Sequence, residues 1–235
     1  MSGAAQSPVF CAVDTADFGK AKNLAANIAG HVQGLKLGLE FFLAHGEVGY
    51  RRIASLGLPI FLDLKLHDIP NTVAGALRSL LPLQPAFITI HTSGGPGMMR
   101  AAVEVAATAG ATRPKLLGVT VLTSLDATDL TAVGQAPDTA AQVLRLAQLA
   151  KDCGLDGVIC SPEEVTMLRA ALGPDFILMV PGIRPVWAAA GDQKRIMTPR
   201  EAVDAGATYL VIGRPITGAE NPGDAAERIA AELNR

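Results

Sequence analysis

The chain has 235 residues, a length that suits one α/β barrel, because such barrels typically contain ~250 residues. A formal net charge of −2, one Trp and two Tyr argue against a protein that binds nucleic acid through basic tracts and base stacking. The segment 1–8 has no apolar signal-peptide core, and no apolar run approaches the ~20 residues that span a bilayer. We therefore expect a cytoplasmic protein that contacts neither nucleic acid nor membrane.

Eight short apolar segments recur along the chain, and longer amphipathic segments lie between them. The apolar segments are rich in Val, Ile and Leu without strict alternation, which is typical of parallel strands covered on both faces. In chain order they cover residues 9–14, 34–39, 59–65, 86–92, 115–123, 156–161, 176–184 and 208–214. The pattern predicts an α/β fold, a (β/α)8 TIM barrel, with residues 1–235 as a single domain.

The helix-like segments are clearest in the second half of the chain. Residues 138–154 and 162–173 begin with an acidic or proline-containing turn and end on Gly154 and Gly173, which predicts glycine caps at their C-termini. The last segment, 221–235, has the same amphipathic character, and we expect it to close the ring as the eighth helix.

Polar residues gather where the predicted strands end. In (β/α)8 barrels the catalytic residues come from these ends, whereas packing alone would not select polar side chains there. The residues concerned are Asp14, Lys36, Asp63, Lys65, His91, Thr123, Ser124, Ser161, Arg184 and Arg214. Their position predicts a functional site at one mouth of the barrel.

The third predicted strand carries the densest set of charges. Asp63 and Lys65 lie two residues apart, so both should point into the barrel mouth. Asp68 follows three residues later, where Pro70 favours a loop or the start of a helix. Carboxylates on both sides should keep the lysine as an ammonium. This favours a proton donor over the amine nucleophile of a class I aldolase. The alternative is a buried ion-pair network that supports the barrel, although burying such charges is costly.

The loops after the seventh and eighth strands predict a phosphate site. Gly213 would let backbone N–H groups approach an anion, and Arg214 could bind two of its oxygens. The segment 186–196, which contains Gly191 and Gln193, suits a loop that closes over a ligand. The alternative is a surface turn with solvated arginines.

The three cysteines are assigned a packing role. Cys11, Cys153 and Cys160 form no CxxC pair and are odd in number, so neither a disulfide framework nor a zinc site is expected. We expect no metal in the site.

The motifs together resemble the orotidine 5′-phosphate decarboxylase family. The match runs from about Val9 to Pro215, in order and at the strand ends. Its motifs are DLKLHDIPNT (63–72), VDT (13–15), LKLG (35–38), VLTS (121–124), PGIRP (181–185) and VIGRP (211–215). The Asp-x-Lys-x-x-Asp core also occurs in 3-keto-gulonate-6-phosphate decarboxylases and hexulose-phosphate synthases, whereas the DIPNT, GIRP and AGDQ segments resemble the orotidylate enzyme alone.

The resemblance implies a decarboxylase that needs no cofactor and converts orotidine 5′-phosphate to uridine 5′-phosphate, the last step of pyrimidine synthesis. Lys65 would protonate ring carbon 6 after carbon dioxide leaves, and Asp63 would lie beside the substrate carboxylate. Asp14 and Lys36 would bind the ribose hydroxyls.

The resemblance also implies a set of binding residues and a homodimer. Asp68, Ile69 and Thr72 would reach across the dimer interface into the partner's site, and Asp68 would take part in catalysis there. The pyrimidine would face Thr123 and Ser124, and the phosphate would be bound by Arg184, Gln193, Gly213 and Arg214. His67 would be structural, and His91 would support the site.

Two other functions remain open at this point. A related sugar-phosphate decarboxylase would need a divalent metal ion, so its activity would not survive a chelator. A barrel that only senses a nucleotide or sugar phosphate would have no use for a donor lysine, and the complete set of Asp63, Lys65 and Asp68 argues against it.

Overall fold

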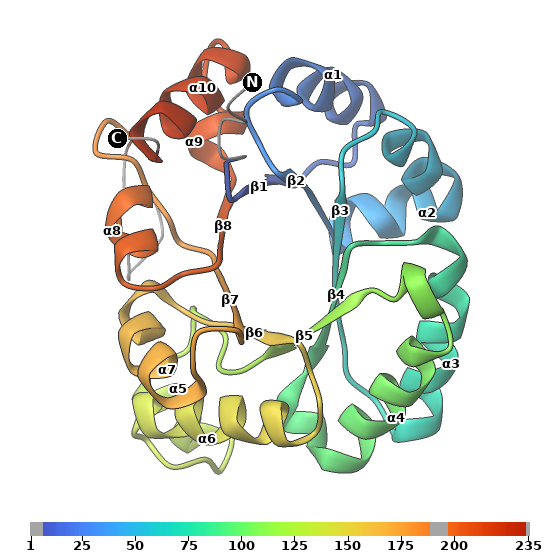
Figure 1. The fold of residues 1–235 in the computed structure, drawn as a ribbon, viewed down its shortest axis with the longest axis vertical. Helices are drawn as coiled ribbons and strands as arrows, with labels where there is room; N and C mark the ends of the chain where they lie inside the picture. The colour runs from blue at the N-terminus through green and yellow to red at the C-terminus, as the bar shows by residue number, and fades with distance from the viewer. Residues whose placement is uncertain (1–6, 189–196, 234–235) are drawn as a thin grey trace.

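A computed structural model of the chain, which describes residues 7–188 and 197–233, contains a closed barrel of eight parallel strands in the order β1 to β8. Figure 1 shows the strands at the centre and the helices as a ring around them. The strands are β1 (Val9–Val13), β2 (Gly34–Gly38), β3 (Ile60–Leu66), β4 (Phe87–His91), β5 (Lys115–Val119), β6 (Gly157–Ile159), β7 (Ile177–Val180) and β8 (Tyr209–Ile212). Strand β1 pairs with both β2 and β8, which closes the barrel and confirms the predicted fold class.

Helices connect the strands and cover the outside of the barrel. They are α1 (Phe18–Ile28), α2 (Leu39–Ala54), α3 (Pro70–Leu80), α4 (Gly95–Ala107), α5 (Ala127–Ala132), α6 (Thr139–Asp152), α7 (Val165–Leu172), α8 (Pro199–Asp204), α9 (Arg214–Thr217) and α10 (Pro222–Leu233). The last of them packs against α1, so it closes the ring as predicted. Gly154 and Gly173 follow α6 and α7 with φ of 84° and 82°, which agrees with the glycine caps predicted there.

Most strands are shorter than predicted, and the fifth and seventh fall furthest short of their predicted ranges. The fifth ends at Val119 and not at residue 123, and the Thr120 hydroxyl just beyond it donates to the carbonyl of Ile159 at 3.0 Å. The seventh ends at Val180 because Pro181 follows, and proline has no N–H for the strand ladder. The freed residues form loops at the C-terminal mouth, which makes room for a site there.

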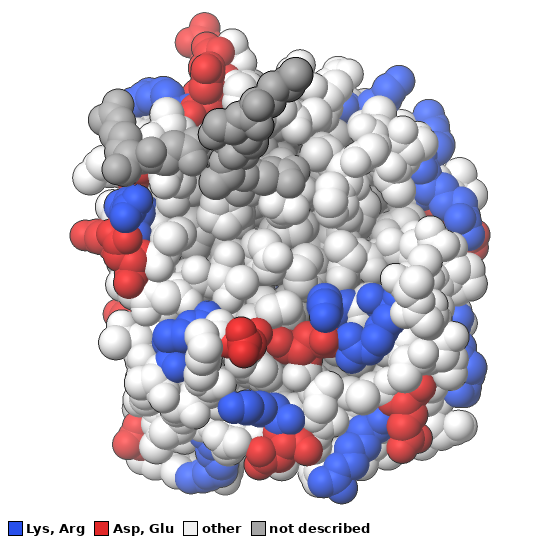
Figure 2. Space-filling view, viewed as in Figure 1, with Lys and Arg blue, Asp and Glu red and all other residues white. Residues whose placement is uncertain are grey.

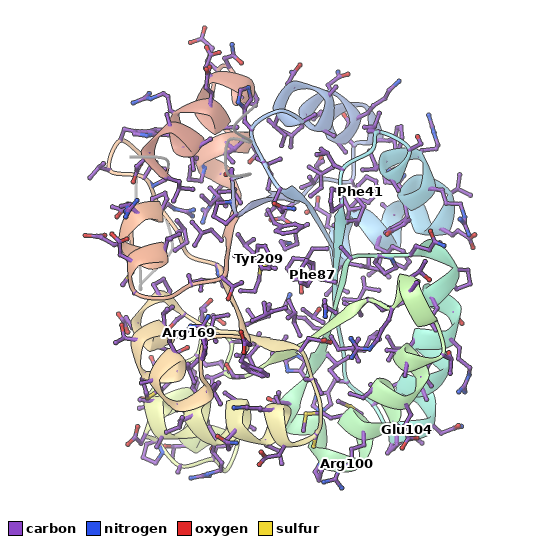
Figure 3. All side chains as sticks on the ribbon, in the orientation of Figure 1. Phe41, Phe87, Arg100, Glu104, Arg169 and Tyr209 are labelled. Atoms are coloured by element: carbon purple, nitrogen blue, oxygen red, sulfur yellow. The ribbon has the colours of Figure 1, made fainter. Side chains whose placement is uncertain are left out.

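Two apolar clusters form the core. The larger lies between the barrel and its helices, and the smaller fills the barrel with Phe10, Phe61, Phe87 and neighbouring aliphatic side chains. Figure 3 shows Phe87 and Tyr209 inside the barrel, whereas Phe41, a residue of α2, lies outside the ring of strands. The rings of Phe10 and Phe87 meet edge to face with centroids 5.4 Å apart, a favourable aromatic geometry. This inner cluster forms a solid floor under the C-terminal mouth.

The described surface is mixed in charge. On the face shown in Figure 2, Lys and Arg side chains are interspersed with Asp and Glu side chains, and uncharged residues lie between them. None of the described helices combines the length and the apolar character that crossing a membrane requires. Cys11, Cys153 and Cys160 are all buried, in agreement with their predicted packing role.

Candidate active site

A cavity of about 170 Å³ opens at the C-terminal ends of the strands, directly above the aromatic floor. Side chains that point inward from most of the strands line it. The lining residues are Lys36, Phe61, Asp63, Lys65, Val119, Val121, Leu122, Thr123, Ile159, Pro181 and Val211. Three charged groups at one side of a largely apolar wall suit a ligand that is apolar over most of its surface and polar at one edge.

Asp63 and Lys65 form the centre of the charged side. The Lys65 Nζ lies 2.8 Å from each carboxylate oxygen of Asp63, and only 10% of the Asp63 side chain is exposed. The shared face predicted for these two residues is confirmed, but the strand is not regular there. It bulges between Leu62 and Leu66, and Lys65 takes a φ of 50°, which non-glycine residues rarely adopt.

A second lysine extends the network toward β1. The Lys36 Nζ lies 3.5 Å from Asp63 and 3.2 Å from Asp14, whose own side chain is exposed at the mouth. The order along the network is therefore Asp14, Lys36, Asp63 and Lys65, with charges of alternating sign. Such a chain keeps each buried charge next to an opposite one.

Burial and neighbouring cations act on Asp63 in opposite directions. Burial is the largest influence and by itself raises the pKa of this carboxyl. Lys36, Lys65 and two side-chain hydrogen bonds together outweigh it, so the pKa of Asp63 falls below its ordinary value of 3.8. Asp63 is therefore ionised near neutral pH.

Thr89 on β4 completes this side of the site, although the sequence analysis did not select it. Its hydroxyl donates to Oδ1 of Asp63 at 2.9 Å, and the Thr89 hydroxyl oxygen accepts a hydrogen bond from the backbone N–H of Lys65 at 2.9 Å. The available signal was its position two residues before His91, where the side chain must point inward from an otherwise apolar strand.

Two histidines lie beside Lys65. The His67 and His91 rings are 5.1 Å apart at an angle of 31°. Burial, followed by the charges of His67 and Lys65, lowers the pKa of His91 below its ordinary 6.5. A neutral His91 would add no positive charge next to Lys65 near neutral pH.

A second hollow, of about 300 Å³, lies where the phosphate site is predicted. Residues from the loop after β7 and from α9 line it: Arg184, Trp187, Ala188, Arg214, Pro215, Gly218 and Ala219. Gly213 directly precedes α9 as its N-cap residue. Arg184 is buried, and its Nη1 donates to the carbonyl of Ile183 at 3.2 Å. Gln193 and Gly191 lie outside the described residues.

The observed contacts of Asp68 differ from the prediction that it lies beside Lys65. In the described part of the chain Lys65 pairs with Asp63, while the Asp68 side chain accepts a hydrogen bond from the N–H of Ile69 at 2.6 Å. Because β3 ends at Leu66, the chain has already turned outward at Asp68. Asp68, Ile69 and Thr72 are all exposed around the start of α3.

The two residues predicted to face the pyrimidine are separated by the shortened fifth strand. Thr123 lines the cavity, whereas Ser124 is exposed and is not part of its lining. Val121 and Leu122 also line the cavity. Sequence reasoning missed them because apolar residues in an expected strand carry no functional signal. Among the described residues, no group of three or more His, Cys, Asp or Glu side chains could hold a metal ion.

Comparison with known proteins identifies the family of the chain. A model of the "Orotidine 5'-phosphate decarboxylase / HUMPS family" matches residues 7–229. The orotidine 5′-phosphate decarboxylase of Rhodospirillum rubrum is 52% identical over 99% of this chain and 96% of its own. The enzyme of that name from Thermobifida fusca is 49% identical, with 97% of each chain covered.

The fold comparison reaches the same family. The crystal structure of orotidine 5′-phosphate decarboxylase from Lactobacillus acidophilus matches with a TM-score of 0.87 and 37% identity, over 98% of this chain and all of that one. The model match, the full-length relatives and the charged cavity all agree with the motifs between Val9 and Pro215. The chain belongs to the orotidine 5′-phosphate decarboxylase family.

Proposed function

We propose that this protein decarboxylates orotidine 5′-phosphate to uridine 5′-phosphate without a cofactor, and that Lys65 is the proton donor. The observation that carries the proposal is the contact of the Lys65 ammonium with both oxygens of Asp63 at the wall of an otherwise apolar cavity. Relatives that are about half identical over nearly the whole chain bear the name of this enzyme. Family membership and site geometry thus support the same reaction.

The nucleotide would be bound through its phosphate, its ribose and its pyrimidine. Arg214 and Arg184 line the outer hollow, where guanidinium groups suit a phosphate. Asp14 and Lys36 at the mouth would bind the ribose hydroxyls, which leaves the apolar cavity for the pyrimidine. Contacts with the remote phosphate can offset the cost of ordering the reacting ring.

The chemical step would then take place beside Asp63 and Lys65. The bond between ring carbon 6 and the carboxylate breaks, carbon dioxide leaves, and the electron pair stays on ring carbon 6. The Lys65 ammonium stabilises this negative charge from a fixed position and gives up a proton to form the new carbon–hydrogen bond. Asp63 holds the ammonium in place, and the neutral amine regains its proton from water.

The homodimer remains part of the proposal. Asp68, Ile69 and Thr72 lie together and exposed around the start of α3, the helix that follows the strand carrying Lys65. A second copy docked over this segment would add Asp68 to the neighbouring site. The cytoplasmic location expected from the sequence stays a prediction.

The test is direct. Purified protein is mixed with orotidine 5′-phosphate, and the change in ultraviolet absorbance that accompanies formation of uridine 5′-phosphate is followed over time. We expect turnover that survives dialysis against a chelator. A chain with Lys65→Ala, purified in the same way, controls for contaminating enzyme. No turnover by the native chain, or turnover abolished by the chelator, would contradict the proposal.

A further inference from the structure

We propose that Thr89 is a positioning residue for this reaction: its hydroxyl sets the orientation of the Asp63 carboxylate and the backbone of Lys65. The inference rests on the proposed decarboxylation, because it concerns the same proton donor. Thr89 is 0% exposed and is not part of the cavity lining, so it would act through its two partners and not by touching the substrate.

The first step of the inference concerns the bulge in β3. Leu62 pairs with Ile88 and Leu66 pairs with Ile90, so the three residues from Asp63 to Lys65 lie opposite the single residue Thr89. A bulge disrupts the regular ladder of backbone hydrogen bonds. At this bulge the N–H of Lys65 donates to the Thr89 hydroxyl, which takes the place of a backbone carbonyl.

The second step concerns the backbone of Lys65. A φ of 50° costs a lysine free energy, and such a conformation persists only where its surroundings hold it. The Thr89 hydroxyl bonds the N–H of this same residue. The hydroxyl therefore helps to keep the backbone in the conformation that directs the Lys65 side chain to Asp63.

The third step fixes the direction of both hydrogen bonds. A backbone N–H can only donate, so the Thr89 oxygen accepts from Lys65, and its single proton is left for Asp63. Oδ1 of Asp63 then has two donors, Thr89 and the Lys65 ammonium, while Oδ2 faces Lys65 at 2.8 Å and Lys36 at 3.5 Å. This set of donors fixes the rotation of the carboxylate.

These contacts should act on the rate of the chemical step more than on binding. A displacement of the donor by about 1 Å can cost about a hundredfold in rate, whereas nucleotide binding depends on groups elsewhere in the site. Losing a hydrogen bond to a charged group corresponds to a change of about ten- to a hundredfold. We therefore expect a lower kcat with a nearly unchanged KM.

The experiment compares variants that differ in the hydroxyl alone. Thr89→Val keeps the shape of the side chain and removes the hydroxyl, while Thr89→Ser keeps the hydroxyl and removes a methyl group. We expect kcat for Thr89→Val to fall by at least about tenfold, with KM and the affinity for uridine 5′-phosphate within about threefold of the native values. Thr89→Ser should retain most of kcat. Thr89→Ala, matched in size to Thr89→Ser, repeats the comparison if the valine chain does not fold.

A measurement on the free protein separates this inference from the proposed function. The pKa of the Asp63 carboxyl, followed by carbon NMR, should be higher in Thr89→Val than in Thr89→Ser or the native chain, because one donor to the ionised form is lost. That result would support the positioning role even if the native chain did not turn over orotidine 5′-phosphate.

Three results would overturn the inference. The first is a Thr89→Val chain with native kcat, and the second is an equal loss of kcat in Thr89→Val and Thr89→Ser. The third is failure of both hydroxyl-free chains to fold while Thr89→Ser folds, since the hydroxyl would then serve the stability of the barrel.

Discussion

The guanidinium carbon of Arg228 lies 4.4 Å from the centre of the Trp187 ring, so α10 holds the loop that follows β7 through a cation–π contact. Trp187 is the one tryptophan of the sequence, and it lines the outer hollow together with Arg214. We predict that uridine 5′-phosphate, by placing a phosphate in this hollow, changes the tryptophan fluorescence in a saturable way, whereas uridine changes it little. Saturation measured by calorimetry without any change in fluorescence would contradict the phosphate assignment.

Removal of the donor lysine should abolish the reaction. We predict that Lys65→Ala leaves the fold and the binding of uridine 5′-phosphate largely intact, while turnover falls below a few percent of native, since general acid catalysis alone contributes about 10²–10⁴-fold. Lys36 still faces Asp63 in this variant, so the carboxylate keeps one cationic partner. Circular dichroism and calorimetry check the fold and the binding. Turnover near the native level would rule out Lys65 as the proton donor.

Removal of the outer arginine should separate phosphorylated from unphosphorylated ligands. Because Arg214 lines the outer hollow, we predict that Arg214→Ala weakens binding of uridine 5′-phosphate by about 1.5–3 kcal/mol, the range for a hydrogen bond to a charged group. Binding of uridine should change little. Calorimetric titration of both ligands measures the difference, and equal losses would show that Arg214 does not contact the phosphate.

Mixing two inactive variants tests the shared site. In a mixed dimer of Lys65→Ala and Asp68→Ala chains, the site on the Asp68→Ala chain has its own Lys65 and receives Asp68 from its partner. If the subunits exchange freely, about half of the dimers are mixed, and roughly a quarter of native activity should return with symmetric two-fold pairing. The assay is turnover before and after subunit exchange.

The opposite outcome is equally informative. If Asp68 served the site of its own chain, no mixed dimer would contain a complete site. A mixture no more active than its parents, after light scattering and mass spectrometry have verified dimers and exchange, would rule out the shared site.

Acidification should reduce the stability that Asp63 contributes. The pKa of Asp63 is lowered in the folded protein, so its contribution is complete above the unfolded value of 3.8 and is lost as the pH falls through the lower folded value. We predict that Asp63→Asn lowers the free energy of unfolding by about 1–3 kcal/mol at neutral pH, because two lysines lose a shared partner. The gap between native and variant should narrow below about pH 4, as measured by urea unfolding. A gap that does not depend on pH would contradict the ionised network.

The barrel could be predicted from the sequence because parallel strands and capped helices leave local patterns. The inward direction of Asp63 and Lys65 followed from their spacing, although the bulge that places Lys65 did not. A bulge depends on pairing with β4, and so does the role of Thr89, whose partners are 24 and 26 residues away in sequence. The position of Ser124 was missed for a related reason, since the end of β5 depends on contacts with β6.

The aromatic floor limits the routes by which ligands can enter and leave the cavity. Phe10, Phe61 and Phe87 fill the barrel below the cavity, and each is at most 6% exposed. The cavity is therefore closed at its lower end, and ligands and water enter and leave through the C-terminal mouth of the barrel. Under the proposed function, carbon dioxide is released deeper than the ribose and must pass the nucleotide or follow it out. Departure of the two products would then be coupled in time.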